Sequence, residues 1–266
     1  MRAFLLIFSA VVLAGCGAAE PASTAQTRIV STSLCGDSYL LSLAPHGDIA
    51  ALSWQSADAL SGAPTSMRSR PKAWDDPERL LALRPTLVIF GPGEGTRAGP
   101  LLDKAGIKHV SLVWGEDFKA VFTNRDIIGK AANIKTPQIG VSARLARTRA
   151  PRVLYLSSSG GTAGTGTFVD AAITRAGGTN IITKSGWHTP SLEMLSQLNP
   201  DLIVTSFFND GYASVNEAGL RSKALQNMLN TTPHVNVPGK LWPCAGPGLY
   251  EATDIIYEAL REVPDE

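Results

Sequence analysis

The side chains that most often hold metals or transfer protons are spread thinly along this chain. A histidine-ligated metal site needs its ligands close together, but the four histidines stand far apart, at His46, His109, His188 and His234. The sequence has neither a Gly-x-Ser-x-Gly elbow nor a His-Glu-x-x-His pair. Asp37 and Asp58 could act as acid or base, yet nothing pairs them with a nucleophile. These residues predict no catalytic centre and no resident metal.

A glycine-rich run, residues 160–167, lies between a predicted strand and a predicted helix. A phosphate-binding loop would occupy this place, but the run lacks the P-loop lysine and does not fit Gly-x-Gly-x-x-Gly. We interpret it as a tight turn that lets the backbone approach a ligand. The hydroxyls of Thr162, Thr165 and Thr167 are candidate hydrogen-bond donors to that ligand.

One stretch of sequence, residues 77–89, returns in similar form at 192–204. The glutamate recurs at 78 and 193 and the proline at 85 and 200, so the offset is 115 residues both times. Each copy predicts a short helix that a proline ends, followed by a strand that is apolar throughout and therefore buried on both faces. Two such units predict two similar α/β lobes with a ligand cleft between them.

Strand and helix patterns alternate along the rest of the chain, as in α/β proteins. We predict an N-terminal lobe at 28–117, with strands at 28–31, 49–52, 87–90 and 110–112 and helices at 38–43, 77–83 and 97–105. The C-terminal lobe, 151–266, should have strands at 152–156, 202–205 and 235–237 and helices at 167–176, 191–198, 222–229 and 249–261. Residues 118–150 predict two connecting helices, one around 126–132 and one over 138–149, which would hold the lobes at a nearly fixed angle.

The N-terminus predicts export. A short apolar stretch follows Arg2, and its length suits a secretory signal rather than a membrane span. Leu-Ala-Gly-Cys at 13–16 resembles the bacterial lipobox, in which Cys16 is acylated; alternatively, the signal is cut nearby and Cys16 is incidental. We expect a signal at 1–16, a flexible tether at 17–27 and a protein of the periplasm or cell envelope, in contact with the membrane only through its lipid. The net charge of +1, without a basic run, argues against nucleic-acid binding.

Over residues 28–261 the sequence resembles the periplasmic Fe/B12-binding family. The resemblance lies in the opening strand, in the doubled Glu-x-x-x-x-Leu-x-Pro-x-Leu units and in the runs 162–167 and 176–181. The resemblance implies a class III periplasmic-binding-protein-like fold: two Rossmann-like lobes joined by a helix, with a shallow groove between them. It also implies a monomeric solute-binding component of an ABC importer, which delivers cobalamin, haem or a ferric siderophore unchanged to a permease dimer with its ATPase. Cobalt or iron would then belong to the transported ligand, and the protein would need no cofactor.

Within this resemblance, Glu78 and Glu193 match the paired glutamates that dock the family's two lobes onto permease arginines. Two exposed carboxylates on equivalent lobes suit a symmetric partner and would give orientation and fast encounter. The alternative is that each carboxylate only stabilises the first turn of its helix through the helix dipole.

Aromatic residues concentrate in the loops that should border the groove, at Trp54, Trp74, Trp187 and Trp242. Such loops follow the carboxyl ends of parallel strands, and an indole can cover a flat ligand such as a corrin or a porphyrin while keeping a hydrogen-bond donor. His188 is also placed to meet a ligand. Alternatively, one or two of these rings fill the core, and we expect Trp114 to be structural.

Cys35 and Cys244 fall in two further loops that the resemblance places beside the groove, on opposite lobes. In an oxidising compartment the expectation is a disulfide that would fix the cleft, provided that their Cα atoms come within about 7 Å. The alternative is that both remain thiols and contact the ligand's metal, alone or together with His188, as soft ligands would.

The sequence therefore predicts a lipid-anchored solute-binding protein for a corrinoid or an iron chelate. A balanced, aromatic groove favours cobalamin or cobinamide, whereas Arg68, Arg70 and Lys72 keep an anionic siderophore open. Two rival functions are an exported enzyme on the same fold and a ligand sensor that works without a permease.

Overall fold

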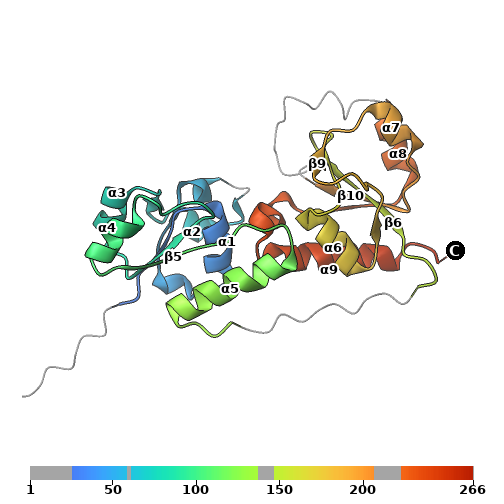
Figure 1. Ribbon diagram of the computed structural model, residues 1–266. Coiled ribbons are helices and arrows are strands. Elements are labelled where there is room, and N and C mark those ends of the chain that lie inside the picture. The colour runs from blue at the N-terminus through green and yellow to red at the C-terminus, as the bar shows by residue number, and fades with distance from the viewer. Residues whose placement is uncertain (1–25, 59–60, 137–146, 207–222, 266) are drawn as a thin grey trace, which may run out of the picture.

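The computed structural model describes residues 26–58, 61–136, 147–206 and 223–265. Within these residues the chain forms two α/β lobes that lie side by side (Figure 1). The predicted signal, Cys16 and nearly all of the predicted tether lie outside the described residues, as does most of the helix predicted at 138–149.

The N-terminal lobe is a parallel sheet of five strands in the order β3-β2-β1-β4-β5. The strands are β1 (Ile29–Ser31), β2 (Ile49–Ser53), β3 (Lys72–Ala73), β4 (Leu87–Phe90) and β5 (Lys108–Ser111). The central strands β1 and β4 are buried along their whole length, as their unbroken apolar runs predict. The helices are α1 (Leu34–Leu43), α2 (Thr65–Arg68), α3 (Pro77–Ala82), α4 (Gly99–Lys104) and α5 (Phe118–Ala132), with short 3-10 turns η1 (His46–Asp48) and η2 (Trp54–Ala57).

The C-terminal lobe has a parallel sheet in the order β11-β10-β6-β8 and a small antiparallel pair, β7 with β9. Its strands are β6 (Arg152–Ser157), β7 (Thr162–Ala163), β8 (Thr179–Asn180), β9 (Trp187–His188), β10 (Leu202–Ser206) and β11 (His234–Asn236). Its helices are α6 (Phe168–Ala176), α7 (Leu192–Gln197), α8 (Lys223–Thr231) and α9 (Gly248–Arg261), and its 3-10 turns are η4 (Gly239–Leu241) and η5 (Pro243–Ala245).

The duplicated sequence occupies equivalent places in the two sheets. The order β2-β1-β4-β5 in one lobe corresponds to β8-β6-β10-β11 in the other, with the repeated strands β4 and β10 beside the opening strands β1 and β6. Both repeated helices have a capped start: the side chain of Asp76 accepts a hydrogen bond from the Arg79 amide, and that of Ser191 accepts one from the Met194 amide.

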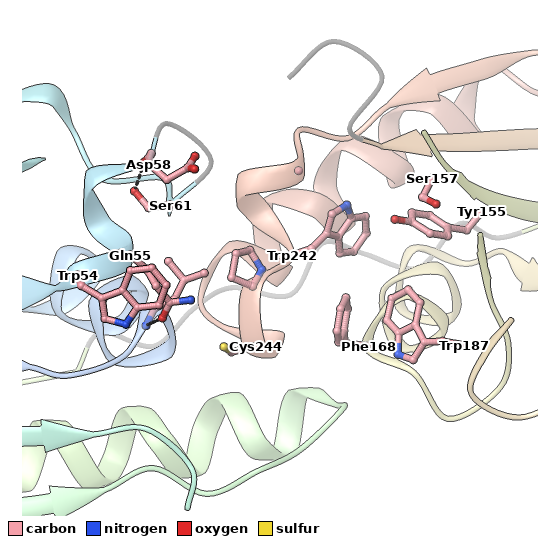
Figure 2. Close-up of a pocket in the computed structure, with 13 residues that line it drawn as sticks. Trp54, Gln55, Asp58, Ser61, Tyr155, Ser157, Phe168, Trp187, Trp242 and Cys244 are labelled. Atoms are coloured by element: carbon pink, nitrogen blue, oxygen red, sulfur yellow. Dashed lines mark hydrogen bonds between the residues drawn. The ribbon is translucent and has the colours of Figure 1, made fainter. Parts of the chain in front are cut away.

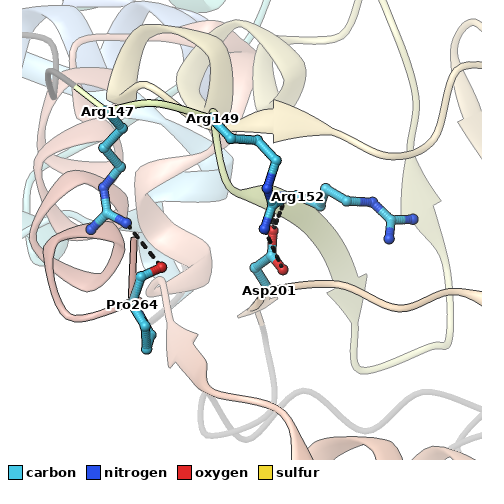
Figure 3. A network of polar contacts seen from close by, with 5 residues as sticks. All are labelled: Arg147, Arg149, Arg152, Asp201 and Pro264. Carbon is cyan, nitrogen blue, oxygen red and sulfur yellow. Dashed lines mark hydrogen bonds and ion pairs between the residues drawn. The ribbon is translucent and has the colours of Figure 1, made fainter. Parts of the chain in front are cut away.

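The residue after each repeated proline anchors the opening strand of its lobe. Thr86 accepts a hydrogen bond from the Arg28 amide at 2.9 Å, and Asp201 accepts one from the Arg152 amide at 2.6 Å. Asp201 also pairs with the Arg149 guanidinium at 2.8 Å (Figure 3). The chain entering the C-terminal lobe is thereby tied to the amino end of its sheet.

The connection between the lobes is described only in part, because residues 137–146 lie outside the described residues. The first predicted helix is α5, which packs on α1 and β5 and buries Val121 and Ile128 in the core. It ends at Asn133, which adopts the left-handed conformation. The described end of the second predicted helix, residues 147–149, is not helical. There the Arg147 guanidinium donates to the Leu260 carbonyl at 2.6 Å, and Figure 3 shows its further bond to Pro264.

A continuous apolar core joins the two lobes. One cluster of buried side chains includes Ile29 and Tyr39 of the N-terminal lobe together with Val153 and Ile256 of the C-terminal lobe. At the junction, the ring of Tyr250 packs against those of Phe118 and Phe122, with centroids 5.1 and 6.1 Å apart, and the Arg175 guanidinium lies 4.3 Å from the centre of the Phe118 ring. This packing favours the fixed angle that we expected a helical connection to provide.

Candidate ligand-binding groove

A cleft of about 620 Å³ opens between the lobes, at the carboxyl ends of β1, β2 and β6. This is where ligands bind in open parallel sheets. Hereafter we call it the main groove. Figure 2 shows the side chains from both lobes that face it. It is lined by Leu34, Trp54, Gln55, Asp58, Ser61, Tyr155, Ser157, Phe168, Trp187, Gly239, Trp242, Pro243 and Cys244.

Four aromatic rings that pack on one another form the C-terminal wall of the groove, and we call them the aromatic quartet: Tyr155, Phe168, Trp187 and Trp242. Ring centroids lie 5.0 Å apart for Phe168 and Trp187, and 5.9 Å apart both for Phe168 and Trp242 and for Tyr155 and Trp242. Tyr155 and Trp242 are almost fully buried, whereas Trp187 is 49% exposed. The quartet therefore offers a large apolar surface whose rings hold one another in place.

Hydrogen bonds behind the quartet engage the polar atoms of its two buried rings, Tyr155 and Trp242. The indole nitrogen of Trp242 donates to the Ser206 hydroxyl at 2.9 Å, and that hydroxyl donates to the Val237 carbonyl at 2.8 Å. Burial raises the pKa of Tyr155 well above its usual value, although a hydrogen bond with Ser206 opposes the shift. The phenol therefore stays neutral, and this wall carries no charge.

The N-terminal wall is built around Trp54, which begins the turn after β2 and is 54% exposed. Beside it, the side-chain carbonyl of Gln55 accepts a hydrogen bond from the Leu34 amide at 3.2 Å. Figure 2 shows Trp54 and Gln55 on one lobe, facing the quartet on the other. A single exposed indole on this side can adjust to a ligand in a way that the packed quartet cannot.

A buried carboxylate holds the turn that carries Trp54. Asp37 on α1 is fully buried and accepts hydrogen bonds from the amide of Ser53, at 2.9 Å, and from its hydroxyl. Burial raises the pKa of Asp37 to about 6, although the two bonds from Ser53, a contact with the Ser31 hydroxyl and the charge of Lys72 oppose the shift. The end of β2, next to Trp54, thus depends on a group that titrates near pH 6.

The Cys35–Cys244 disulfide closes the floor of the groove. The two Cα atoms are 5.3 Å apart, although the residues are 209 positions apart in sequence. Cys35 is buried on α1, and Cys244 faces the groove from η5 with left-handed backbone dihedrals. With both sulfurs in the bond, neither is the thiolate that the alternative of metal contact required.

The structure brings some of the predicted ligand-binding residues into the groove and leaves others outside. Trp54, Trp187, Trp242 and Cys244 line it, while Cys35 lies behind the lining as the partner of Cys244. Trp74 lies outside it, on the loop before α3, with the Arg79 guanidinium 4.4 Å from the centre of its ring.

Three other predicted residues bond to backbone rather than line the groove. The Thr162 hydroxyl is buried and donates to the Tyr155 carbonyl at 2.6 Å, and the Thr165 hydroxyl donates to the Thr183 carbonyl at 3.0 Å. The Nε2 atom of His188 is 3.2 Å from the Lys184 carbonyl oxygen. The glycine-rich turn thus shapes the lobe beneath the quartet instead of presenting its hydroxyls to the cleft.

The cations considered for an anionic siderophore also lie outside the lining. Arg68 donates to the Ala63 carbonyl, Arg70 to the His46 carbonyl, and the Lys72 ammonium to the Ser56 hydroxyl and the Arg68 carbonyl, both at 2.7 Å. Among the described lining residues there is no lysine, arginine or histidine, and Asp58 is the one ionisable carboxylate.

Sequence reasoning missed several lining residues, above all Tyr155 and Phe168. Tyr155 lies in the middle of an apolar strand, where it reads as core, but Phe168 follows the glycine-rich run directly and could have been suspected. The expectation for Trp114 was wrong. We expected it to be structural, but its side chain is 72% exposed, because the loop after β5 turns it away from the core.

Glu78 and Glu193 are both exposed, in the first turns of α3 and α7. Figure 1 shows α3 on the outer part of one lobe and α7 on the outer part of the other. Elsewhere in the described residues, no helix is long and apolar enough to span a bilayer, and no group of three or more His, Cys, Asp or Glu side chains could hold a metal ion.

Comparison with known proteins identifies the fold. No protein-family model matches the sequence, and no curated protein matches it. Among solved structures, a periplasmic heme-binding protein, BhuT, in complex with two hemes is 20% identical, with a TM-score of 0.65 over 89% of this chain and 98% of that one. The periplasmic heme-binding protein HutB of Vibrio cholerae is 21% identical, with a TM-score of 0.63 over 88% and 99%.

The periplasmic vitamin B12 binding protein BtuF of Vibrio cholerae is 17% identical, with a TM-score of 0.57 over 90% of this chain and 98% of that one. All three are named as binding proteins. The chain therefore has the two-lobed α/β fold of class III periplasmic binding proteins, as the resemblance implied.

Proposed function

We propose that this protein is the solute-binding component of an ABC importer and that its ligand is a corrinoid of the cobalamin or cobinamide type. The observation that carries the proposal is the main groove: about 620 Å³ between two lobes, with the aromatic quartet on one side and Trp54 on the other. A flat, bulky ring can lie against such surfaces.

The charge of the groove supports a corrinoid over haem or an anionic siderophore. Haem and such siderophores carry carboxylates or other anions, which need a cation close by to offset their desolvation. No lysine or arginine stands among the described lining residues. Corrinoid side chains are mostly neutral amides, which can hydrogen-bond to groups such as Gln55 and Ser157.

Docking to a permease is supported by the exposed Glu78 and Glu193. They occupy equivalent positions in the duplicated helices, and the helix dipole alone would not require the same residue twice. The export pattern of the N-terminus, with Cys16 as its lipid anchor, would place the protein at the outer face of a membrane that contains such a permease.

Calorimetric titration of the purified protein with cobinamide, cobalamin, haem and a ferric catecholate siderophore tests the ligand class. We expect the corrinoids to bind at micromolar Kd or better and the two anionic ligands to bind at least tenfold more weakly. Binding of haem or the siderophore alone would contradict the corrinoid, and absence of binding by all four would contradict the transport function.

Docking is tested by reversing both charges, in the variant Glu78→Lys/Glu193→Lys. Because neither carboxylate lies in the groove, ligand affinity should be unchanged while cellular uptake is lost. A matched control is Glu258→Lys, an exposed carboxylate on α9 outside the repeat, which should leave uptake intact. A fall in ligand affinity in the double variant would assign these glutamates a role other than docking.

A further inference from the structure

Two smaller cavities lie beyond the disulfide, and the nearer one shares lining residues with the main groove. A narrow cavity of about 110 Å³ is lined by both Cys35 and Cys244 and shares Phe168 with the main groove. It also shares Trp114 and Glu116 with a compartment of about 480 Å³ between the loop after β5 and the start of α6. We call this second space the outer compartment. The three cavities thus follow one another along the carboxyl edge of the N-terminal sheet, from the β2 loop to the β5 loop.

Trp114 is the most prominent side chain of the outer compartment. At 72% it is the most exposed of the large hydrophobic side chains in the described residues, and the neighbouring Val113 is 41% exposed. Keeping an indole in water costs free energy that burial against a ligand would recover. Trp114 lies along the same edge of the N-terminal sheet as Trp54, where a ligand between the lobes could cover it. This position gives a reason for its exposure.

The outer compartment is acidic. Its described lining holds three carboxylates and one ammonium, that of Lys119. Glu116 accepts a hydrogen bond from the Phe168 amide at 3.2 Å, across the lobes, and Asp170 accepts from the Gly166 amide at 3.0 Å and from the Asn180 side chain at 3.1 Å. Asp117 accepts one from the Ala120 amide at 2.9 Å.

An ionised carboxylate offers about four acceptor positions on its two oxygens. The bonds that hold Glu116, Asp117 and Asp170 in place therefore leave acceptor capacity for a ligand. Groups that donate hydrogen bonds, such as primary amides, suit this surface. A ligand carboxylate would meet a surplus of like charge in the same space.

We infer that the ligand extends past the disulfide into the outer compartment, where Trp114 covers part of it and Glu116, Asp117 and Asp170 select amide over carboxylate substituents. This inference rests on the proposed function and makes it more specific. The corrin ring suits the test because the same ring exists with amide side chains, in cobinamide, and with carboxylate side chains, in cobyrinic acid.

Titration calorimetry with these two compounds measures both parts of the inference. Wild-type protein should bind cobinamide at least tenfold more tightly than cobyrinic acid. Trp114→Ala should weaken cobinamide binding about tenfold, and Trp114→Phe should restore most of the loss. Glu116→Gln/Asp117→Asn removes two charges, and each amide keeps the one oxygen that accepts the bond from the Phe168 or the Ala120 amide. This variant should reduce the preference for cobinamide over cobyrinic acid severalfold.

Trp74→Ala is the matched control, because Trp74 is a partly exposed indole of the same lobe outside the groove. It should leave both affinities unchanged. Trp114 is exposed, so its replacement should not alter the melting temperature, which is measured alongside. If Trp114→Ala binds cobinamide as the wild type does, or the wild type shows no preference between the two compounds, the inference is overturned. If the wild type binds neither compound, the proposed function fails and this inference with it.

Discussion

The two walls of the main groove both present aromatic rings to the cleft, but they are built differently. The C-terminal wall is four aromatic rings in mutual contact, two of them buried, with their polar atoms bonded behind them. The N-terminal wall is an exposed indole on a short turn, held through Ser53 by a buried carboxylate. The two lobes share their sheet order and the repeated helix, whereas the loops after their strands differ and build one packed and one exposed surface.

The largest expected effect is on the free energy of unfolding, and it differs between the two walls. Trp242→Ala removes a buried ring from the quartet and leaves Ser206 without its donor, so the free energy of unfolding should fall by about 3–5 kcal/mol. Trp54→Ala removes an exposed ring and should change it by no more than about 0.5 kcal/mol, while weakening ligand binding. Urea denaturation measures both. Equal losses in the two variants would show that the walls do not differ as described.

A smaller effect is the pH dependence of stability, which we expect from the N-terminal wall. Because the pKa of Asp37 is raised to about 6 in the folded protein, from 3.8, its contribution to stability is greatest below about pH 4. That contribution is lost as the pH rises through 6, by roughly 3 kcal/mol in total. Asp37 is the only fully buried carboxylate among the described residues, so the C-terminal wall should show no such dependence.

Urea denaturation of wild type and Asp37→Asn at pH 4, 5, 6 and 7 measures this contribution. The difference in unfolding free energy between the two proteins should vary with pH over this range, while each protein's other groups cancel. A constant difference would mean that Asp37 does not titrate there.

The smallest effect compares the anchors at the amino ends of the two sheets. Asp201→Ala loses a charge-assisted bond to the Arg152 amide and the pair with Arg149, so we expect a loss of about 1–2 kcal/mol. Thr86→Ala loses a neutral bond to the Arg28 amide, which should cost about 0.5–1 kcal/mol. Thermal unfolding at pH 7 measures both. Burial alone would raise the pKa of Asp201, but the bonds and charges of Arg149 and Arg152 together outweigh it and lower the pKa. The difference between the two anchors should therefore shrink at acidic pH.

Many of the helices and strands could be predicted because the sequence patterns that specify them are local. The strand at 87–90 was predicted exactly, since a strand buried on both faces is an unbroken apolar run ended by a turn. The helix predicted to begin at Ser38 begins at Leu34 instead, because the Ser33 side chain caps it through the Gly36 amide. The short strands β3, β7, β8 and β9 have two residues each, too few to show a period.

The candidate site was harder to predict because exposure is decided by tertiary packing. Trp242 and Trp114 are both tryptophans that follow strands, yet one is 3% and the other 72% exposed. Nothing in the neighbouring sequence distinguishes them. The sequence predicted the Cys35–Cys244 disulfide only as one of two alternatives, because spacing along a chain does not give distance in space.

The disulfide at the floor of the groove has a consequence for how the protein is made. It joins one of the first helices to one of the last turns. The floor of the groove therefore cannot close until the turn that carries Cys244 has packed against the helix that carries Cys35. Formation of this bond then depends on an oxidant that acts on two lobes that have already met.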